Sequence, residues 1–232
     1  MLLRKFLSSR KMTLILLSGW AISIVYAYFF IPPRDDDGIY LLPALYVANG
    51  LPPGFFIEEE FVLVFFIFPF QVLLNGQFLS LVQPDLYNYR LLNLILILPL
   101  LISTGSFIKL LFKDDEKTNL PFNLFLIILA ASPFTTNFYV NRPDILGLLF
   151  FILGLLVVTR NLQTSTPRSY STIASFLFLG LSCISHPAFI ILTLPIVIFL
   201  FYKLAKANTS LWSILICCFS FSFPLLLFFL WF

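Results

Sequence analysis

The sequence predicts an all-α polytopic membrane protein with about seven transmembrane helices and two short juxtamembrane helices in the first outer loop. We expect one module over residues 1–232. Hydrophobic residues make up 60% of the chain and charged residues only 11%, whereas soluble domains are about half apolar and about a quarter charged. The apolar residues also come in long runs rather than in alternating segments, which favours transmembrane helices over a β-barrel.

The first element is an apolar run over residues 12–31, about 20 residues, which is enough to cross a bilayer. It is longer than the core of a signal peptide and has no convincing small-residue cleavage site. We therefore expect a retained signal-anchor helix. Its basic flank, with Arg4, Lys5, Arg10 and Lys11, is expected on the cytoplasmic side.

Three adjacent carboxylates, Asp35–Asp37, follow this helix where it should leave the membrane. Ionisable residues at such a boundary belong either to a solvated loop or to a functional site. Residues 40–49 are too few to cross, and Pro43 limits the helix further. They predict a short interfacial helix, with the acidic run just before the positive end of its dipole.

A second apolar segment, residues 61–74, follows Glu58, Glu59 and Glu60 and is followed by Asn75-Gly76. Its length of about 14 residues is closer to an interfacial or re-entrant helix than to a full crossing. We expect Asn75-Gly76 to end it. Six further spans are predicted over residues 91–108, 120–140, 145–159, 172–185, 187–202 and 211–232.

The distribution of charge selects this topology. If neither short helix crosses, 11 of the 14 Lys and Arg lie on the cytoplasmic side, the three exceptions being Arg34, Arg90 and Arg142. If residues 61–74 crossed instead, the basic residues of every later loop would lie outside, against the positive-inside rule. The favoured topology gathers most acidic residues on the outer face, and only those of the 114–116 segment lie inside.

Several motifs on this outer face resemble those of a known family. The string Asp36-Asp37-Gly38-Ile39-Tyr40, followed by Ala44 and Asn49-Gly50, resembles the first outer-loop signature of the C-type (GT-C fold) membrane glycosyltransferases. Arg90-Leu91 resembles the opening of the family's second span, and Arg142-Pro143-Asp144 resembles its polar turn before the fourth span. The nearest subgroup contains the dolichyl-phosphate-mannose–protein mannosyltransferase and aminoarabinose-transferase relatives.

This resemblance implies transfer of a sugar from a polyprenyl-phosphate-linked donor to a glycan, lipid or protein acceptor on the periplasmic or lumenal face. A carboxylate would then deprotonate or position the acceptor. The resemblance assigns that role to Asp36 or Asp37, with Asp36 aligned to the first acid of the family pair. The alternative is a solvated acidic loop. Glu58, Glu59 and Glu60 are candidates for a second acid, or belong to a solvated segment.

The candidates for binding the substrate or its phosphate are Arg90, Arg142, Asp144, His186 and Tyr40, and those for the phosphate itself are Arg90, Arg142 and His186. Arginine suits phosphate because its planar group donates two parallel hydrogen bonds. Each candidate has a structural alternative. Arg90 could extend along the membrane interface to reach water, Arg142 and Asp144 could form a turn pair, and His186 could cap a turn.

Other classes of function receive less support from the sequence. A divalent metal ion bound by carboxylate oxygens is left open, and a single histidine excludes a multi-His site. No basic patch for nucleic acid stands outside the cytoplasmic loops. A transporter or lipid-handling protein would need charges near the bilayer midplane, and a non-catalytic subunit is the third hypothesis. The expected location is a bacterial plasma membrane, or the endoplasmic reticulum in a eukaryote. Relatives usually continue with further spans, so we leave open that the chain is a fragment.

Overall fold

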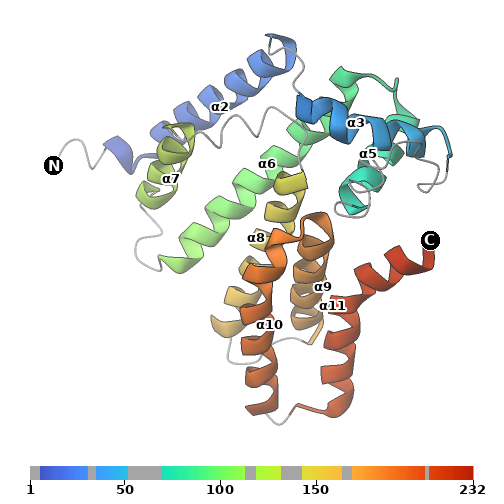
Figure 1. Cartoon of the computed structure of the whole chain (residues 1–232). Helices are drawn as coiled ribbons and strands as arrows, with labels where there is room; N and C mark the ends of the chain where they lie inside the picture. The colour runs from blue at the N-terminus through green and yellow to red at the C-terminus, as the bar shows by residue number, and fades with distance from the viewer. Residues whose placement is uncertain are drawn as a thin grey trace.

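The computed structural model describes residues 6–30, 35–51, 69–112, 119–131, 143–163, 169–206 and 209–231. Within these ranges every regular element is helical, as predicted (Figure 1). The helices are α2 (Arg10–Phe30), α3 (Asp35–Ala48), α5 (Pro69–Leu81), α6 (Leu86–Leu111), α7 (Leu120–Ala131), α8 (Pro143–Gln163), α9 (Ser169–Ser185), α10 (Ala188–Lys206) and α11 (Leu211–Trp231).

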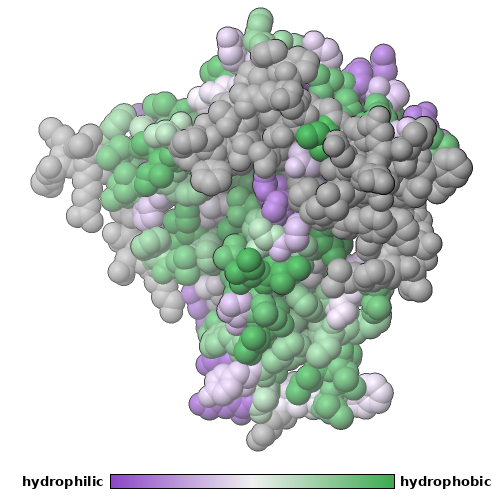
Figure 2. Space-filling model, viewed as in Figure 1, coloured by the Kyte–Doolittle hydropathy of each residue, from purple (hydrophilic) through white to green (hydrophobic). Residues whose placement is uncertain are grey.

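Four of the described helices are long and apolar enough to cross a membrane, namely α2, α6, α8 and α10. Helices α7, α9 and α11 coincide with the other predicted spans, but their described apolar stretches are shorter. Figure 2 shows hydrophobic surface over much of the described chain, with most hydrophilic atoms toward its upper and lower parts. These features are compatible with a membrane protein.

Side-chain hydrogen bonds join several helix ends that the predicted topology assigns to the same side. Asn123 Nδ2, in the first turn of α7, donates to Leu7 O at 2.6 Å and so holds the start of the chain against α7. Gln163 Nε2, at the end of α8, donates to Leu110 O at the end of α6 at 3.3 Å. Figure 1 shows α6, α8 and α10 ending toward the lower side of the view.

Basic residues concentrate at these helix ends. Of the seven Lys and Arg in the described ranges, all but Arg90 stand at the start of α2 or in the last turns of α6, α8 and α10. We call this side the basic end, defined by Arg10, Lys11, Lys109, Arg160, Lys203 and Lys206.

The described acidic residues belong to the opposite helix ends. Asp35–Asp37 open α3, Asp85 precedes α6, and Asp144 lies in the first turn of α8. A ring contact between Tyr28 and Tyr87, with centroids 5.8 Å apart, places the end of α2 beside the start of α6. We call this side the acidic end.

Three predicted boundaries in the first outer loop are wrong. The acidic run does not precede a helix that begins at Tyr40, because it forms the first turn of α3 itself. Pro43 lies inside α3 rather than limiting it. Asn75-Gly76 does not end the second short helix, since α5 continues to Leu81. Residues 61–68 of that predicted helix lie outside the described ranges.

The close packing of α3 on α5 explains why Gly76 stands inside a helix. A Cβ atom at this position would overlap the side chain of Val47 and lie 3.0 Å from Ala44 O. Glycine therefore allows the two helices to approach closely. Sequence reasoning treated Asn-Gly as a turn signal, whereas here tertiary packing determines the residue.

Two core clusters hold the longer helices together. The first joins α2, α6, α7 and α8 through residues such as Trp20, Leu101 and Leu126. The second joins α8, α9, α10 and α11 around Phe176 and Leu179. Helix α8 contributes to both clusters. This packing places the start of α8 between α6 and the turn that connects α9 to α10.

Candidate functional site

The candidate site lies at the acidic end, where the starts of α3, α6 and α8 gather with α5 and the turn between α9 and α10. Helix α5 packs against both α6 and α9, and α6 packs against α8. A ring contact between Phe70 of α5 and Phe150 of α8, with centroids 5.7 Å apart, ties these parts together. The site therefore draws on segments that are far apart in the sequence.

A small apolar cluster anchors α3 and α5 to α6. Its buried members are Ala44 of α3, Leu79 of α5 and Tyr89 of α6, and Tyr40 packs against them. Because Tyr40 is fixed here, the helix turn that carries Asp36 and Asp37 is held close to the start of α6. The structure describes the backbone of these two aspartates, while their side chains lie outside the description.

Arg90 follows Tyr89 directly and is only 2% exposed. The helix begins earlier than predicted, because Asp85 Oδ1 accepts from Asn88 N at 2.7 Å and caps α6. Arg90 is therefore inside the first turns of the helix and covered by protein. This burial does not fit the interpretation of Arg90 as a side chain that reaches along the interface to water. A buried guanidinium must be held by polar partners.

Asp144 and His186 are the predicted site residues that the structure brings into direct contact. His186 Nε2 lies 3.0 Å from Asp144 Oδ1, and the side chains are 20% and 35% exposed. Proline suits the first turn of a helix, so Pro143 starts α8 and leaves Asp144 close to the positive end of the helix dipole. A carboxylate there is stabilised as the anion.

The second ring nitrogen of His186 contacts the backbone of the following helix. Ala188 N, in the first turn of α10, donates to His186 Nδ1 at 3.2 Å. With Nδ1 accepting, Nε2 is the ring nitrogen that faces the carboxylate of Asp144. The bond from Ala188 N is a turn contact of the kind that the structural alternative for His186 predicts.

Gly147, one turn after Asp144, allows α8 to pack against this histidine. A Cβ atom at position 147 would lie 2.6 Å from the ring of Phe189 and 3.2 Å from His186 Cβ. Phe189 in turn meets the His186 ring edge-on, with centroids 6.0 Å apart. The geometry of the Asp144–His186 contact therefore depends on a glycine that sequence reasoning did not single out.

Other predicted residues lie outside the described ranges. These are Arg142, Glu58, Glu59 and Glu60. Among the described residues no group of three His, Cys, Asp or Glu side chains gathers as metal ligands. The structure thus brings Asp144 into contact with His186. Separately, it packs Tyr40 against the cluster around Tyr89.

Sequence reasoning missed several polar side chains that are buried in these elements. Gln71 and Asn75 of α5 and Asn93 of α6 are each 1% exposed, and Ser182 of α9 is fully buried. In the sequence, these side chains could have been recognised as isolated polar residues within apolar runs. Burying an amide is costly without hydrogen bonds, so an isolated amide within an apolar run indicates a polar contact inside the protein.

Comparisons of the chain with protein families, with curated protein sequences and with solved structures find no match.

Proposed function

We propose that the chain is an integral membrane glycosyltransferase that uses a polyprenyl-phosphate-linked sugar and acts at its acidic end. One observation carries the proposal. The helix turn with Asp36 and Asp37, the buried Arg90 and the Asp144–His186 contact all belong to the acidic end, while the other described cations stand at the basic end. Among the described residues Arg90 is the arginine at this end, and an arginine near carboxylates suits a reaction that handles a phosphate and an acidic proton.

Each group has a role in this reaction. Asp36, or its neighbour Asp37, accepts the proton of the acceptor hydroxyl or amine as it attacks the sugar. Arg90 holds the phosphate leaving group, because its guanidinium can donate two parallel hydrogen bonds. The Asp144–His186 contact fixes the start of α8 against the α9–α10 turn, and so shapes the opposite wall of the site. The donor reaches the site from the outer leaflet, and the acceptor reaches it from the outer side of the membrane.

The proposal includes a topology. The seven helices α2, α6, α7, α8, α9, α10 and α11 cross the membrane, and α3 and α5 lie at its outer surface. The basic end is cytoplasmic because cationic residues favour that side. The acidic end then faces the periplasm, or the lumen in a eukaryotic cell.

The test compares three neighbouring substitutions. Asp36→Asn, Asp37→Asn and the matched control Asp35→Asn are purified in detergent, and their thermal unfolding is measured first. Each is then assayed with radiolabelled undecaprenyl-phosphate mannose, glucose, galactose and aminoarabinose and with a membrane extract as acceptor. General-base loss should lower transfer about 100-fold or more in Asp36→Asn or Asp37→Asn, and leave Asp35→Asn active.

Two outcomes would overturn the proposal. One is full transfer by all three variants, because the base must then be another residue. The other is that the native chain neither transfers from nor binds any donor in the panel. Arg90→Lys provides a further check, since it keeps the charge but loses the paired donors, and should weaken donor binding in a folded protein.

A further inference from the structure

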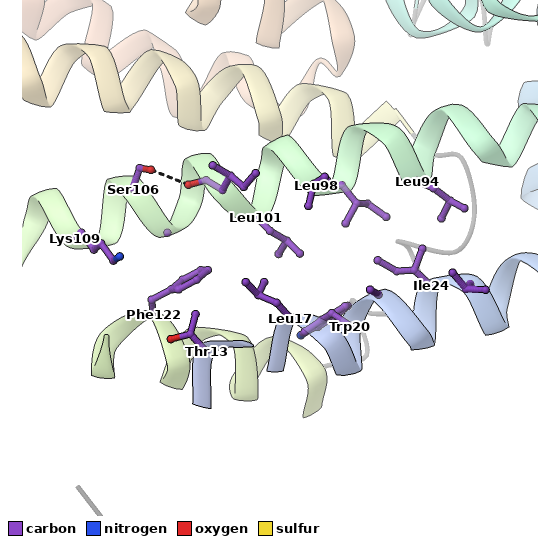
Figure 3. Close-up of a pocket in the computed structure, with 15 residues that line it drawn as sticks. Thr13, Leu17, Trp20, Ile24, Leu94, Leu98, Leu101, Ser106, Lys109 and Phe122 are labelled. Atoms are coloured by element: carbon purple, nitrogen blue, oxygen red, sulfur yellow. Dashed lines mark hydrogen bonds between the residues drawn. The ribbon is translucent and has the colours of Figure 1, made fainter. Parts of the chain in front are cut away.

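A cavity of about 600 Å³ lies between α2, α6 and the start of α7 (Figure 3). This volume is in the range of pockets that hold one small ligand. The walls are almost entirely aliphatic and aromatic. Six of the lining residues are Leu17, Trp20, Ile24, Leu94, Leu98 and Phe122.

The polar atoms of the cavity gather at one end. Figure 3 shows Thr13, Ser106 and Lys109 together near Phe122, whereas Leu94 lies at the other end. Ser106 Oγ donates to Ile102 O at 2.9 Å, and Thr13 Oγ1 donates to Ser9 O at 3.4 Å, so both hydroxyl protons are used within their own helices. The ammonium group of Lys109 is therefore the charged group of this cavity.

The cavity opens sideways, to the surface that the fold presents to hydrocarbon. Among its lining residues, Leu98 and Ile102 are each 61% exposed and Val25 is 54% exposed. An apolar cavity of this kind does not hold water. In a bilayer the group available to enter it from the side is a lipid chain.

The dimensions suit one such chain. Leu94 and Lys109 stand fifteen residues apart on α6, so the cavity follows the helix for about 22 Å at 1.5 Å per residue. The hydrocarbon core of a bilayer is about 30 Å thick, so each leaflet contributes about 15 Å. A chain that enters from one leaflet, with its polar head at Lys109, would therefore lie along α6 and fill the cavity past its midpoint.

The charge at that end selects the lipid. Lys109 belongs to the basic end, together with Arg10 and Lys11 at the start of α2. The described carboxylates all belong to the acidic end, so Lys109 forms no ion pair with a residue in the described ranges. Cations near a membrane surface attract anionic lipid headgroups.

From these observations we propose that the cavity binds one acyl chain of an anionic glycerophospholipid from the leaflet at the basic end, with its phosphate against Lys109. This site is distinct from the proposed donor site, and it does not depend on glycosyltransferase activity. A lipid bound here bridges α2 and α6, which otherwise share few direct contacts.

Trp20 provides the experiment, because it lines the cavity while Trp212 is exposed on α11. The full chain carrying Trp212→Phe and Trp231→Phe is reconstituted in phosphatidylcholine nanodiscs. Phosphatidylglycerol with a dibrominated acyl chain is then titrated in, since bromine quenches a tryptophan that it touches. Quenching of Trp20 should saturate at a mole fraction about fivefold lower than with dibrominated phosphatidylcholine, the ratio expected for one lysine near a membrane surface.

Two variants separate the headgroup from the chain. Lys109→Gln should remove the preference for phosphatidylglycerol, whereas the matched control Lys203→Gln, at the basic end of α10, should retain it. Ala21→Phe, which adds a ring to the cavity wall, should reduce quenching by both lipids. Thermal unfolding of each variant establishes that it is folded before quenching is compared.

The proposal is overturned if the two brominated lipids quench Trp20 equally in the native background, or if Lys109→Gln keeps the preference. It is also overturned if undecaprenyl phosphate displaces brominated phosphatidylglycerol at equal mole fraction. That result would assign the cavity to an isoprenoid carrier instead.

Discussion

His186 Nε2 lies 3.0 Å from Asp144 Oδ1, and this contact ties the first turn of α8 to the turn between α9 and α10. The other ring nitrogen of His186, Nδ1, accepts from Ala188 N, so one imidazole contacts the starts of both α8 and α10. Such a residue acts first as a structural link. Its effect on the site follows from where it holds Asp144.

A double-mutant cycle measures this link. Asp144→Ala, His186→Ala and the double variant should show a coupling free energy of about 0.2–1 kcal/mol, because both side chains are partly exposed. Thermal unfolding in detergent provides the values. The cycle subtracts the separate loss of the cap on α10, and a coupling of zero would mean that the contact does not form.

Gly147→Ala tests the packing behind this contact. The added Cβ would lie 2.6 Å from the Phe189 ring and 3.2 Å from His186 Cβ, so we expect a loss of about 1–3 kcal/mol. Gly19→Ala is the matched control, because nothing lies within 4 Å of its added Cβ. The control should raise stability by up to about 1 kcal/mol, as alanine favours a helix over glycine. Equal melting temperatures for the two variants would contradict the packing described.

Gly180→Ala should cost more than Gly147→Ala. At Gly180 the new Cβ would overlap the backbone carbonyl of Phe221 in α11, whereas at Gly147 it would meet a side chain that can turn aside. A backbone atom moves only if α9 and α11 separate along their contact. The two variants are compared by thermal unfolding in the same detergent, and the reverse order would show that α11 adapts easily.

Asn123 connects the start of the chain to α7. It is fully buried, and its Nδ2 donates to Leu7 O at 2.6 Å and to Ser9 O at 3.3 Å. Asn123→Ala should cost about 1–3 kcal/mol, because two part-buried carbonyls lose their donor. Asn49→Ala is the control, since Asn49 makes a similar bond to Leu45 O at 2.7 Å on an exposed surface and should cost less. Chemical denaturation compares the two, and equal losses would contradict the prediction.

The order of the helices could be predicted from the sequence because each apolar run is long and the loops between runs are polar. The structural role of residues that are selected by tertiary packing could not be predicted in this way. Gly76 stands within α5 because α3 approaches it, and a single sequence shows this glycine only as part of a turn signal. Arg90, Asp144 and His186 were each predicted as site residues. The burial of Arg90 and the pairing of the other two depend on how α6, α8 and α9 pack.

The topology that accompanies the proposed function can be measured by cysteine labelling. Cys183, Cys217 and Cys218 are first replaced by alanine, and single cysteines are then placed at the acidic end by Gln83→Cys and at the basic end by Asn119→Cys. Gln83 is exposed between α5 and α6, and Asp85 is left intact because it caps α6. A membrane-impermeant maleimide applied to intact cells should label position 83 at once. Position 119 should react only after the membrane is permeabilised, because the basic residues around it favour the cytoplasm. Labelling of position 119 from outside, with position 83 protected, would reverse the orientation and remove the outward-facing site.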